Sequence, residues 1–441
     1  MTGQIQNTII PDRLEGIDER FKTVASDVIR ANLADYLDAV IGALFPDPVA
    51  GIKEVIRRFL FTASQDGPNC CRSKFVDSEA VVAELKKIHP FSPTAMYEAI
   101  CRISQSWNIA PPIAAIGGKG GSYAGDPPAA DRYTTISISP AADAIFFKGI
   151  NLEALPKMMG KSGKIEPKYF VPAIPMTLLL ANYTIGFAYQ SKTVALNFDA
   201  VCDLAALYAR HMDENPTGAF DCSKYPHLFI PDFPTAGYLT NSEELLAEYR
   251  NNNFKAKIRM DGVYHLSQDK IVINTLPFGD SFEELEQTIT GDEKNQNKPG
   301  VYQKGSVYDK KIASVVALSS PDNAQAQLTI TLKRSANPFD VWDDLLKLFK
   351  ISGTFVPNPN YRVPDTGEIA ELTYANLLRI WYTARRSILL STKRKSQQSL
   401  IRRLRLTEAQ YIVVDHMDEV VAIIRQNTSE NAQLRLRERF N

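Results

Sequence analysis

The C-terminal stretch from Glu371 onward constrains the fold most strongly. Its apolar residues recur in steps of four, three and four, the spacing of one face of a helix: Leu377, Trp381, Ala384 and Ile388. We expect one helix up to about Leu406 and a second from about Thr407 to Gln426. Both exceed the average helix length, so the pattern predicts an extended helical hairpin rather than part of a globular core. The basic run Lys393–Arg405 is most simply a solvated helix face.

The composition is that of a folded chain with several domains. Its 441 residues allow two to four domains of about 100–200 residues each. With 44% hydrophobic and 23% charged residues, whole-chain disorder is excluded. Basic and acidic residues number 50 each, so the net charge is zero. This excludes a generally basic, histone-like protein but leaves room for a local basic groove.

No segment has the pattern of a membrane anchor or a metal site. The N-terminal residues lack the apolar core of a signal peptide, and no run of about 18 apolar residues occurs, so we expect a soluble, cytoplasmic protein. The five cysteines form no C-x-x-C pair and are expected to be reduced thiols. The five histidines are scattered, without an H-E-x-x-H motif. We therefore predict no metal bound by this chain.

A glycine cluster, Gly117–Ser122, resembles a nucleotide-binding loop only superficially. A P-loop requires Ser or Thr after its lysine, and Lys119 is followed by Gly120. The dinucleotide fingerprint requires a helix after the loop, whereas the alternating residues Tyr133–Ser139 predict a strand. We expect no ATP site here, but a loop whose backbone lets something bulky approach.

Several other elements are predicted by periodicity and capping. Asn197 is a plausible N-cap for a helix over Asn197–Arg210. Three further segments read as strands, and a polar stretch over Thr290–Lys304 reads as a surface loop. The three strands are Lys255–Met260, Lys270–Leu276 and Gln327–Lys333.

Several short motifs occur in a fixed order along the chain. They are Gly51–Arg58 (GIKEVIRR), Ile88–Ile100 (IHPFSPTAMYEAI), Gly121–Thr134 (GSYAGDPPAADRYT), Ile174–Pro175, Ile185–Gly186 and Pro231–Thr235 (PDFPT). Together they resemble the DNA-cleaving subunit of type IIA DNA topoisomerases, of the gyrase A or topoisomerase IV A type. The resemblance is collinear from about Asn32 to the C-terminus.

The resemblance implies an α+β multidomain fold. After an N-terminal extension (residues 1–28) it implies a winged-helix DNA-cleavage domain (29–150), an α/β tower domain (151–335) and a long helical coiled-coil arm (336–441). Because the chain stops where the family's lower dimer gate begins, we expect that gate to be absent or carried by a separate chain. Such short forms resemble the medium subunits of large bacteriophages, which would place the protein in the bacterial host cytoplasm.

The resemblance also implies a catalytic set. Taken alone, Arg132 and Tyr133 would be a solvated side chain and a packing residue. In the family's motif, this tyrosine attacks a DNA phosphodiester and forms a phosphotyrosyl link. Arg132 would neutralise charge on the phosphoryl oxygens, and His89 would donate a hydrogen bond or a proton. A tyrosine hydroxyl is a weak nucleophile at neutral pH, so nearby cations are needed.

Further residues are implied to contact DNA. Ile185 is the candidate wedge that bends DNA by insertion between base steps, with Tyr183 as the other option. On the residues alone, an ordinary core isoleucine is the simpler interpretation of Ile185. The residues implied to contact DNA directly are Lys53, Arg57, Arg58, Lys119 and Ser122.

The implied partners are double-stranded DNA, a second copy of the chain and a separate subunit. That subunit would hold ATP and, in its Toprim domain, most of the ligands of Mg²⁺. The chain departs from the family's pattern at Phe91, where a second histidine is usual, at Ser92-Pro93, at Ala43 and in the glycine loop. These departures favour an alternative, a cleavage-deficient DNA-binding scaffold. A third interpretation, a winged-helix regulator unrelated to topoisomerases, would account for residues 29–140 but not for the PDFPT motif or the long helical arm.

Overall fold

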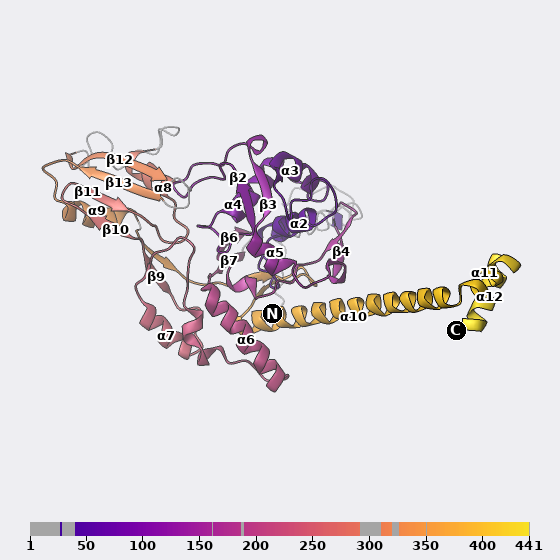
Figure 1. Cartoon of the computed structure of the whole chain (residues 1–441). Helices are drawn as coiled ribbons and strands as arrows, with labels where there is room; N and C mark the ends of the chain where they lie inside the picture. Colours follow the sequence, from indigo (N-terminus) through magenta and orange to yellow (C-terminus); the bar gives the residue numbers. More distant parts are fainter. Residues whose placement is uncertain are drawn as a thin grey trace, which may run out of the picture. The chain divides into compact units, whose positions relative to one another are not determined.

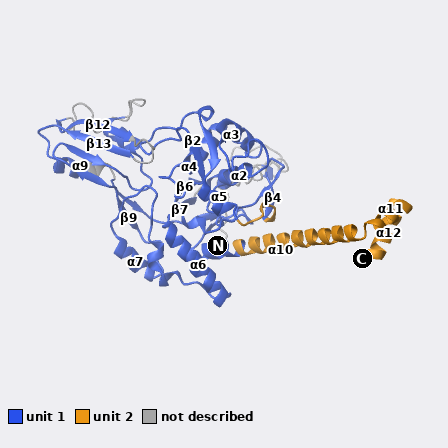
Figure 2. Cartoon of the chain, viewed as in Figure 1, with its two compact units in different colours: residues 1–148, 155–384 blue, residues 149–154, 385–441 orange. Residues whose placement is uncertain are grey.

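The structure is a computed structural model that describes residues 27–28, 40–160, 162–186, 189–291, 310–319, 326–349 and 351–440 (Figure 1). It divides into two compact units (Figure 2). The first comprises residues 1–148 and 155–384, and the second comprises residues 149–154 and 385–441. Most of the predicted N-terminal extension (residues 1–28) and most of the predicted loop Thr290–Lys304 lie outside the described residues. The described part contains both helices and strands, which confirms the mixed α and β character.

The N-terminal part of the first unit places helices around a small sheet (Figure 1). The antiparallel strands lie in the order β1-β3-β2, and α2, α3 and α4 pack against one another. The helix α2 buries Phe59, Leu60 and Ala63. The bounds are α2 Glu54–Ala63, β1 Val76–Asp77, α3 Ser78–Lys86, α4 Pro93–Ser104, β2 Ala114–Gly117, η1 Asp131–Tyr133, β3 Thr135–Ile138 and α5 Pro140–Phe146.

Two-stranded hairpins and a long helix follow. The predicted N-cap is confirmed, because the Asn197 side chain accepts hydrogen bonds from the amides of Asp199 and Ala200 at the start of α6. That helix ends at Glu214, four residues later than predicted. The bounds are β4 Lys157–Met159 with β5 Ile165–Pro167, β6 Asn182–Gly186 with β7 Tyr189–Thr193, α6 Phe198–Glu214, and β15 Asn360–Arg362 with β16 Ile369–Glu371.

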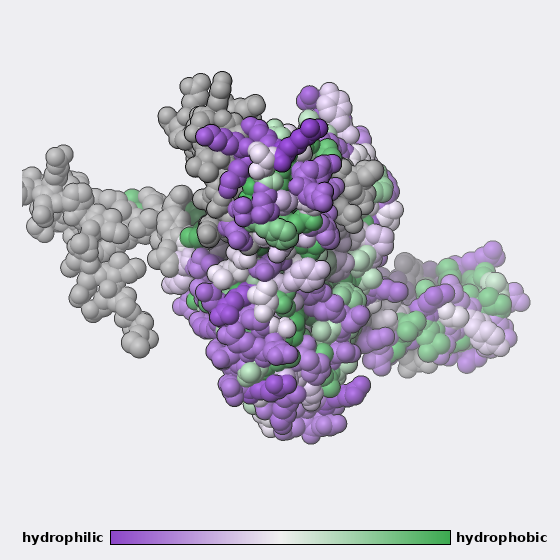
Figure 3. All heavy atoms as spheres, turned by 90° about the vertical axis from the view of Figure 1, so that its left-hand side faces the viewer, coloured by the Kyte–Doolittle hydropathy of each residue, from purple (hydrophilic) through white to green (hydrophobic). Residues whose placement is uncertain are grey.

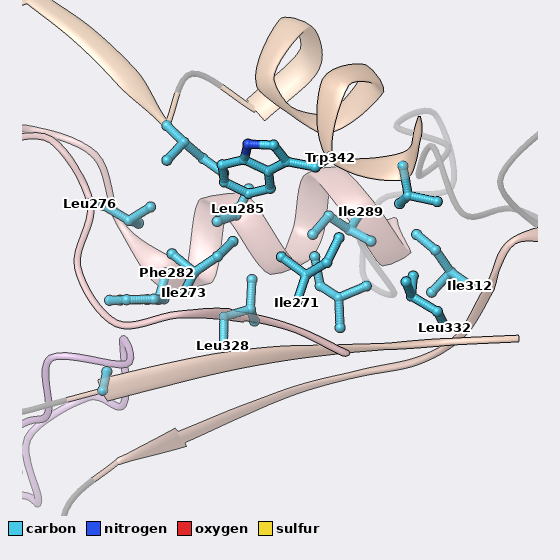
Figure 4. Packing of buried hydrophobic residues seen from close by; sticks show 14 residues of the cluster. Ile271, Ile273, Leu276, Phe282, Leu285, Ile289, Ile312, Leu328, Leu332 and Trp342 are labelled. Atoms are coloured by element: carbon cyan, nitrogen blue, oxygen red, sulfur yellow. The ribbon is translucent and has the colours of Figure 1, made fainter. Parts of the chain in front are cut away.

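A four-stranded antiparallel sheet in the order β10-β11-β13-β12 carries its own core (Figure 4). Alternate residues of β13 are buried, which puts one face of the sheet against helices α8 and α9. Figure 4 shows Leu285 and Ile289 of α8 and Trp342 of α9 gathered over Ile271 and Ile273 of β11. The bounds are β10 Tyr264–Leu266, β11 Lys270–Ile273, α8 Phe282–Thr290, β12 Ile312–Ser319, β13 Ala326–Leu332 and α9 Pro338–Phe349.

A smaller three-stranded sheet, β14-β9-β8, completes this region. The predicted strands at residues 270–276 and 327–333 are confirmed with slightly shifted ends, and the strand predicted at 255–260 begins later, at Ile258. Figure 3 views the molecule from the β12–β13 end, and the surface on this side is mostly hydrophilic with scattered apolar patches. The bounds are β8 Tyr238–Leu239, α7 Ser242–Arg250, β9 Ile258–Asp261 and β14 Ser352–Phe355.

The C-terminal helices differ from the prediction. A single helix of 42 residues, α10 Tyr374–Asp415, runs through the predicted break at Leu406 and Thr407. The break was wrong because no Gly or Pro interrupts this stretch, and because the Thr407 hydroxyl donates to the carbonyl of Arg403 one turn back, which keeps threonine inside a helix. The helical hairpin is formed instead by α11 Met417–Gln426 and α12 Ser429–Phe440, joined by an Arg439–Glu419 ion pair of 2.7 Å.

No helix among the described residues is both long enough and apolar enough to cross a membrane.

Candidate functional site

Tyr133 and Arg132 lie on a short 3₁₀ turn rather than on a strand. The turn η1 ends at Tyr133, and β3 begins two residues later, at Thr135. The Tyr133 side chain is one of the most exposed large apolar groups, with 70% of its surface open to solvent. The Arg132 guanidinium carbon lies 4.7 Å from the centre of the Tyr133 ring. This arrangement presents a phenol hydroxyl to solvent with a cation directly beside it.

Buried hydrogen bonds anchor this turn to the neighbouring helices. Thr134, directly after Tyr133, is buried, and its hydroxyl oxygen lies 2.8 Å from that of Ser78 in α3 and 2.9 Å from that of Tyr97 in α4. The Tyr97 hydroxyl also donates to the carbonyl of Ala129, 2.7 Å away. Because these bonds hold Ala129 and Thr134, the backbone on both sides of Tyr133 is fixed. A positioned nucleophile requires such a fixed backbone.

His89 is buried, and its ring is held from two sides. Its Nδ1 lies 2.8 Å from Nη1 of Arg58, and its ring centre lies 4.5 Å from that of Phe91. Burial, and then the positive charge of Arg58, lower the pKa of His89 to about 4, so the ring is neutral at physiological pH. Among the described residues, no hydrogen bond joins His89 to Arg132 or Tyr133. The hydrogen bond of His89 therefore goes to Arg58 on α2 and not to the turn that carries Tyr133.

Arg57 and Arg58 of α2 were predicted to contact DNA directly. Both side chains are buried, because Arg58 has no exposed surface and Arg57 is 5% exposed; their contact with DNA stays a prediction, which this burial does not favour. The reason for the burial is a buried carboxylate, Glu166 of β5, which accepts from Arg58 at 2.9 Å and from Arg57 at 3.3 Å. The Arg57 guanidinium also donates to the carbonyl of Pro167. Both cations are thus used inside the protein.

Lys53 connects the start of α2 to the β6–β7 hairpin. Its ammonium group donates to the hydroxyl of Thr184, 3.0 Å away, and burial lowers its pKa. On β6 the side chains alternate, so that Thr184 is buried while Tyr183 and Ile185 point outward. Ile185 is 62% exposed, so the interpretation as a core isoleucine is wrong. An exposed isoleucine on a hairpin is consistent with the wedge role, which stays a prediction.

The glycine-rich loop contains one residue that matches its predicted role poorly. Ser122 is buried, and its hydroxyl donates to the Asp126 carboxylate at 2.8 Å, which does not favour its predicted direct contact with DNA. The half-exposed Lys119 has its ammonium 3.7 Å from the same carboxylate and remains open to a ligand. The loop also allows a close approach. At Gly125, where φ is +109°, a Cβ atom would lie 2.7 Å from the Cβ of Glu283 in α8.

Tyr123 fixes this loop against the β10–β13 region, a role that sequence reasoning missed. Its ring packs edge-on against Phe282 of α8, with ring centres 5.1 Å apart. Its hydroxyl donates to the carbonyl of Thr235 and accepts from the amide of Leu276, both at 3.4 Å. The bulky group that the loop approaches is therefore this part of the same chain. An aromatic residue inside a glycine-rich loop was the available signal.

Comparison with known proteins places these residues in a family. Residues 44–441 match the family described as the A subunit of DNA gyrase/topoisomerase IV. The match covers most of the chain, including every described residue of the site. The chain belongs to this family.

Individual members of the gyrase/topoisomerase IV A family are also similar to this chain over most of its length. The DNA gyrase A subunit of Haloquadratum walsbyi is 27% identical over 410 residues, which cover 91% of this chain and 45% of that protein. The DNA gyrase A subunit of Lawsonia intracellularis is 25% identical over 433 residues, covering 96% and 50%. The DNA topoisomerase 4 A subunit of Streptococcus pneumoniae is 26% identical over 390 residues, covering 88% and 45%. The chain spans about half the length of these relatives.

Among the described residues, no three His, Cys, Asp or Glu side chains come together in a way that could hold a metal ion.

Proposed function

We propose that this chain is the DNA-cleaving subunit of a type IIA topoisomerase. Two copies would each attack one strand through Tyr133, making a transient double-strand break for ATP-driven strand passage, and then reseal it. The observation that carries the proposal is the exposed Tyr133 hydroxyl beside Arg132, on a turn anchored by buried hydrogen bonds. Family membership supports the same conclusion.

The chemistry follows from this arrangement. The Tyr133 oxygen attacks phosphorus, a phosphotyrosyl bond forms, and the bond from phosphorus to a deoxyribose oxygen breaks. The tyrosine proton is lost and a proton is gained by the leaving deoxyribose oxygen, so the step is balanced. Arg132 stabilises the charge that develops on the phosphoryl oxygens, because its planar fork matches their geometry. The covalent link conserves the phosphodiester energy, so resealing requires no ATP.

The partners are part of the same proposal. Lys53 and Lys119 would contact the DNA backbone, and Ile185 would insert between base steps. A separate subunit would bind ATP and provide the Toprim site for Mg²⁺, which would neutralise phosphate charge during cleavage. This chain would contribute the nucleophile and the adjacent arginine.

One observation favours a second candidate function, a DNA-binding scaffold that does not cleave. Phe91 occupies the position of the second histidine in the motif that this chain resembles, and its ring packs on His89 rather than offering a hydrogen bond. A protein with a single buried histidine at this site could hold DNA without cutting it. The same experiment separates the two functions.

Covalent trapping tests the proposal. The protein is mixed with supercoiled DNA, Mg²⁺, ATP and its ATPase/Toprim partner, then denatured rapidly, and protein-linked DNA ends are counted. Wild type is expected to give adducts, and Tyr133→Phe none. Tyr411→Phe is the matched control, because Tyr411 is 71% exposed, like Tyr133, but lies on α10. Absence of adducts in wild type with an active partner would establish the scaffold instead.

A further inference from the structure

A carboxylate buried beside α2 links two arginines to His89. Glu166 lies on β5, and only 1% of its side chain is exposed. Both of its oxygens accept hydrogen bonds from Arg58, with Nε–Oε2 and Nη2–Oε1 distances of 2.9 Å each. Arg57 donates to Oε1 from 3.3 Å. Such a two-pronged pair fixes the plane of the Arg58 guanidinium as well as its position.

The remaining nitrogen of that guanidinium determines the state of His89. Nη1 of Arg58 lies 2.8 Å from Nδ1 of the histidine. Arginine has only donors, so Nδ1 must accept, and a neutral ring then carries its proton on Nε2. Among the described residues, Nε2 has no hydrogen-bond partner, and it is not one of the fully buried unpaired polar atoms. The Nε2–H group is therefore free to donate to a ligand.

The other charged groups around the ring lie on the same two elements. Glu54 of α2 forms an ion pair with Arg58 at 3.0 Å and accepts a hydrogen bond from Arg57 at 3.5 Å. The two arginines and two glutamates balance in charge, so the neutral ring is the one uncharged member of this cluster. Glu54 reaches Arg58 through a single oxygen and lies on the same helix, so it cannot define the guanidinium plane as Glu166 does.

We propose that Glu166 is a positioning residue for DNA cleavage: it orients Arg58 so that His89 is kept as the Nε2–H tautomer, ready to donate to a phosphate oxygen of bound DNA. The inference rests on the proposed function for its role in cleavage, but its effect on His89 does not. Without the carboxylate, nothing holds the Arg58 plane. His89 then loses its fixed donor at Nδ1 and samples both tautomers.

The test is nitrogen-15 NMR of the full chain labelled at histidine, which contains five histidines. His89 is assigned by the signal that disappears in His89→Gln. In wild type we expect an unprotonated Nδ1 and a protonated Nε2. In Glu166→Gln we expect a mixture of tautomers and a lower titration midpoint for His89, because the negative charge of Glu166 raises the pKa of His89 and is absent in the variant. Asp143→Asn is the matched control, because it removes a carboxylate from the 2.6 Å Arg72–Asp143 pair elsewhere in the same region.

The outcomes are separable. An unchanged tautomer and midpoint of His89 in a folded Glu166→Gln protein would overturn the proposal. If the other four histidine signals show that Glu166→Gln does not fold, Glu166→Asp, which keeps the charge, replaces it and is expected to shift the midpoint by a smaller amount. In the trapping assay we expect the rate of adduct formation to fall at least tenfold in Glu166→Gln, with unchanged DNA affinity. A shifted His89 signal together with no adduct from wild type would remove the proposed function and leave the positioning effect intact.

Discussion

Removing Arg58 tests whether the charged cluster on α2 is truly buried. Arg58→Met removes a guanidinium with no exposed surface and three hydrogen bonds to Glu166, at 2.9, 2.9 and 3.3 Å. The carboxylate stays behind with 1% exposure and one remaining cation, Arg57. Breaking a buried pair from one side costs about 3–5 kcal/mol. Because Arg57 remains, we expect a loss near the lower end, about 3 kcal/mol.

The double variant separates burial from packing. Arg58→Met combined with Glu166→Gln leaves no uncompensated carboxylate, so its loss should be smaller than the sum of the two single losses. We expect a coupling free energy of about 2 kcal/mol, within the range found for residues in one hydrogen-bond network. Arg72→Met is the matched control, since its pair with Asp143 is about one-third exposed, and its loss should stay below about 1 kcal/mol.

The measurement must be local, because a chain with more than one compact unit does not unfold in a single step. Native-state hydrogen exchange of the amides of α2 reports the opening free energy of that helix. A loss below about 1 kcal/mol for Arg58→Met, or additive single losses, would refute the reasoning. It would mean that water reaches Glu166 when Arg58 is gone.

Three further predictions follow from individual contacts. Tyr123→Ala should cost about 2–3 kcal/mol by removing the contact with Phe282, which is less than the loss for a fully buried aromatic residue. Hydrogen exchange of the α8 amides measures this loss, and unchanged exchange would contradict the prediction. Asp47→Ala should cost about 1–2 kcal/mol of local stability, because the Asp47 carboxylate accepts from the amides of Val49 and Ala50 at 2.9 and 2.8 Å. Hydrogen exchange of these two amides measures the loss, and Asp47→Asn should lose less. The lowered pKa of His89, about 4, means that between pH 6.5 and 4 the unfolded chain binds a proton that the folded chain does not. Local stability should therefore fall by about 1–2 kcal/mol as pH drops through that window, and His89→Gln should flatten this loss. Hydrogen exchange of the α3 amides at several pH values measures it, and an equal loss in both proteins contradicts the assignment.

Local patterns predicted the elements that depend on neighbouring residues. The Asn197 cap and the strands at residues 270–273 and 326–332 follow from capping and alternation, and the structure contains them. The exposed Tyr133 could be anticipated only through the resemblance of its motif, because a tyrosine before a strand is usually buried. Predictions that depend on distant residues failed. The burial of Arg58 was not predicted, because its partner, Glu166, is 108 residues away in the sequence.

The C-terminal helices illustrate a second limit. A second helix was predicted to begin at about Thr407, but a threonine hydroxyl can bond to the preceding turn of a continuous helix, and here it does. The predicted domain boundaries, the second copy of the chain, the ATP- and Mg²⁺-binding partner and the resemblance to short phage subunits stay predictions.

Mass spectrometry of the trapped adduct tests the central claim most directly. Adducts formed in the presence of the ATPase/Toprim partner are digested with nuclease and then with protease, which leaves a nucleotide on the peptide that carried the DNA. The account predicts a nucleotide on Tyr133, within the peptide that also contains Arg132 or follows it, and on no other tyrosine. A nucleotide on another tyrosine would contradict the assignment of the nucleophile, and a complete absence of modified peptide with an active partner would contradict cleavage by this chain.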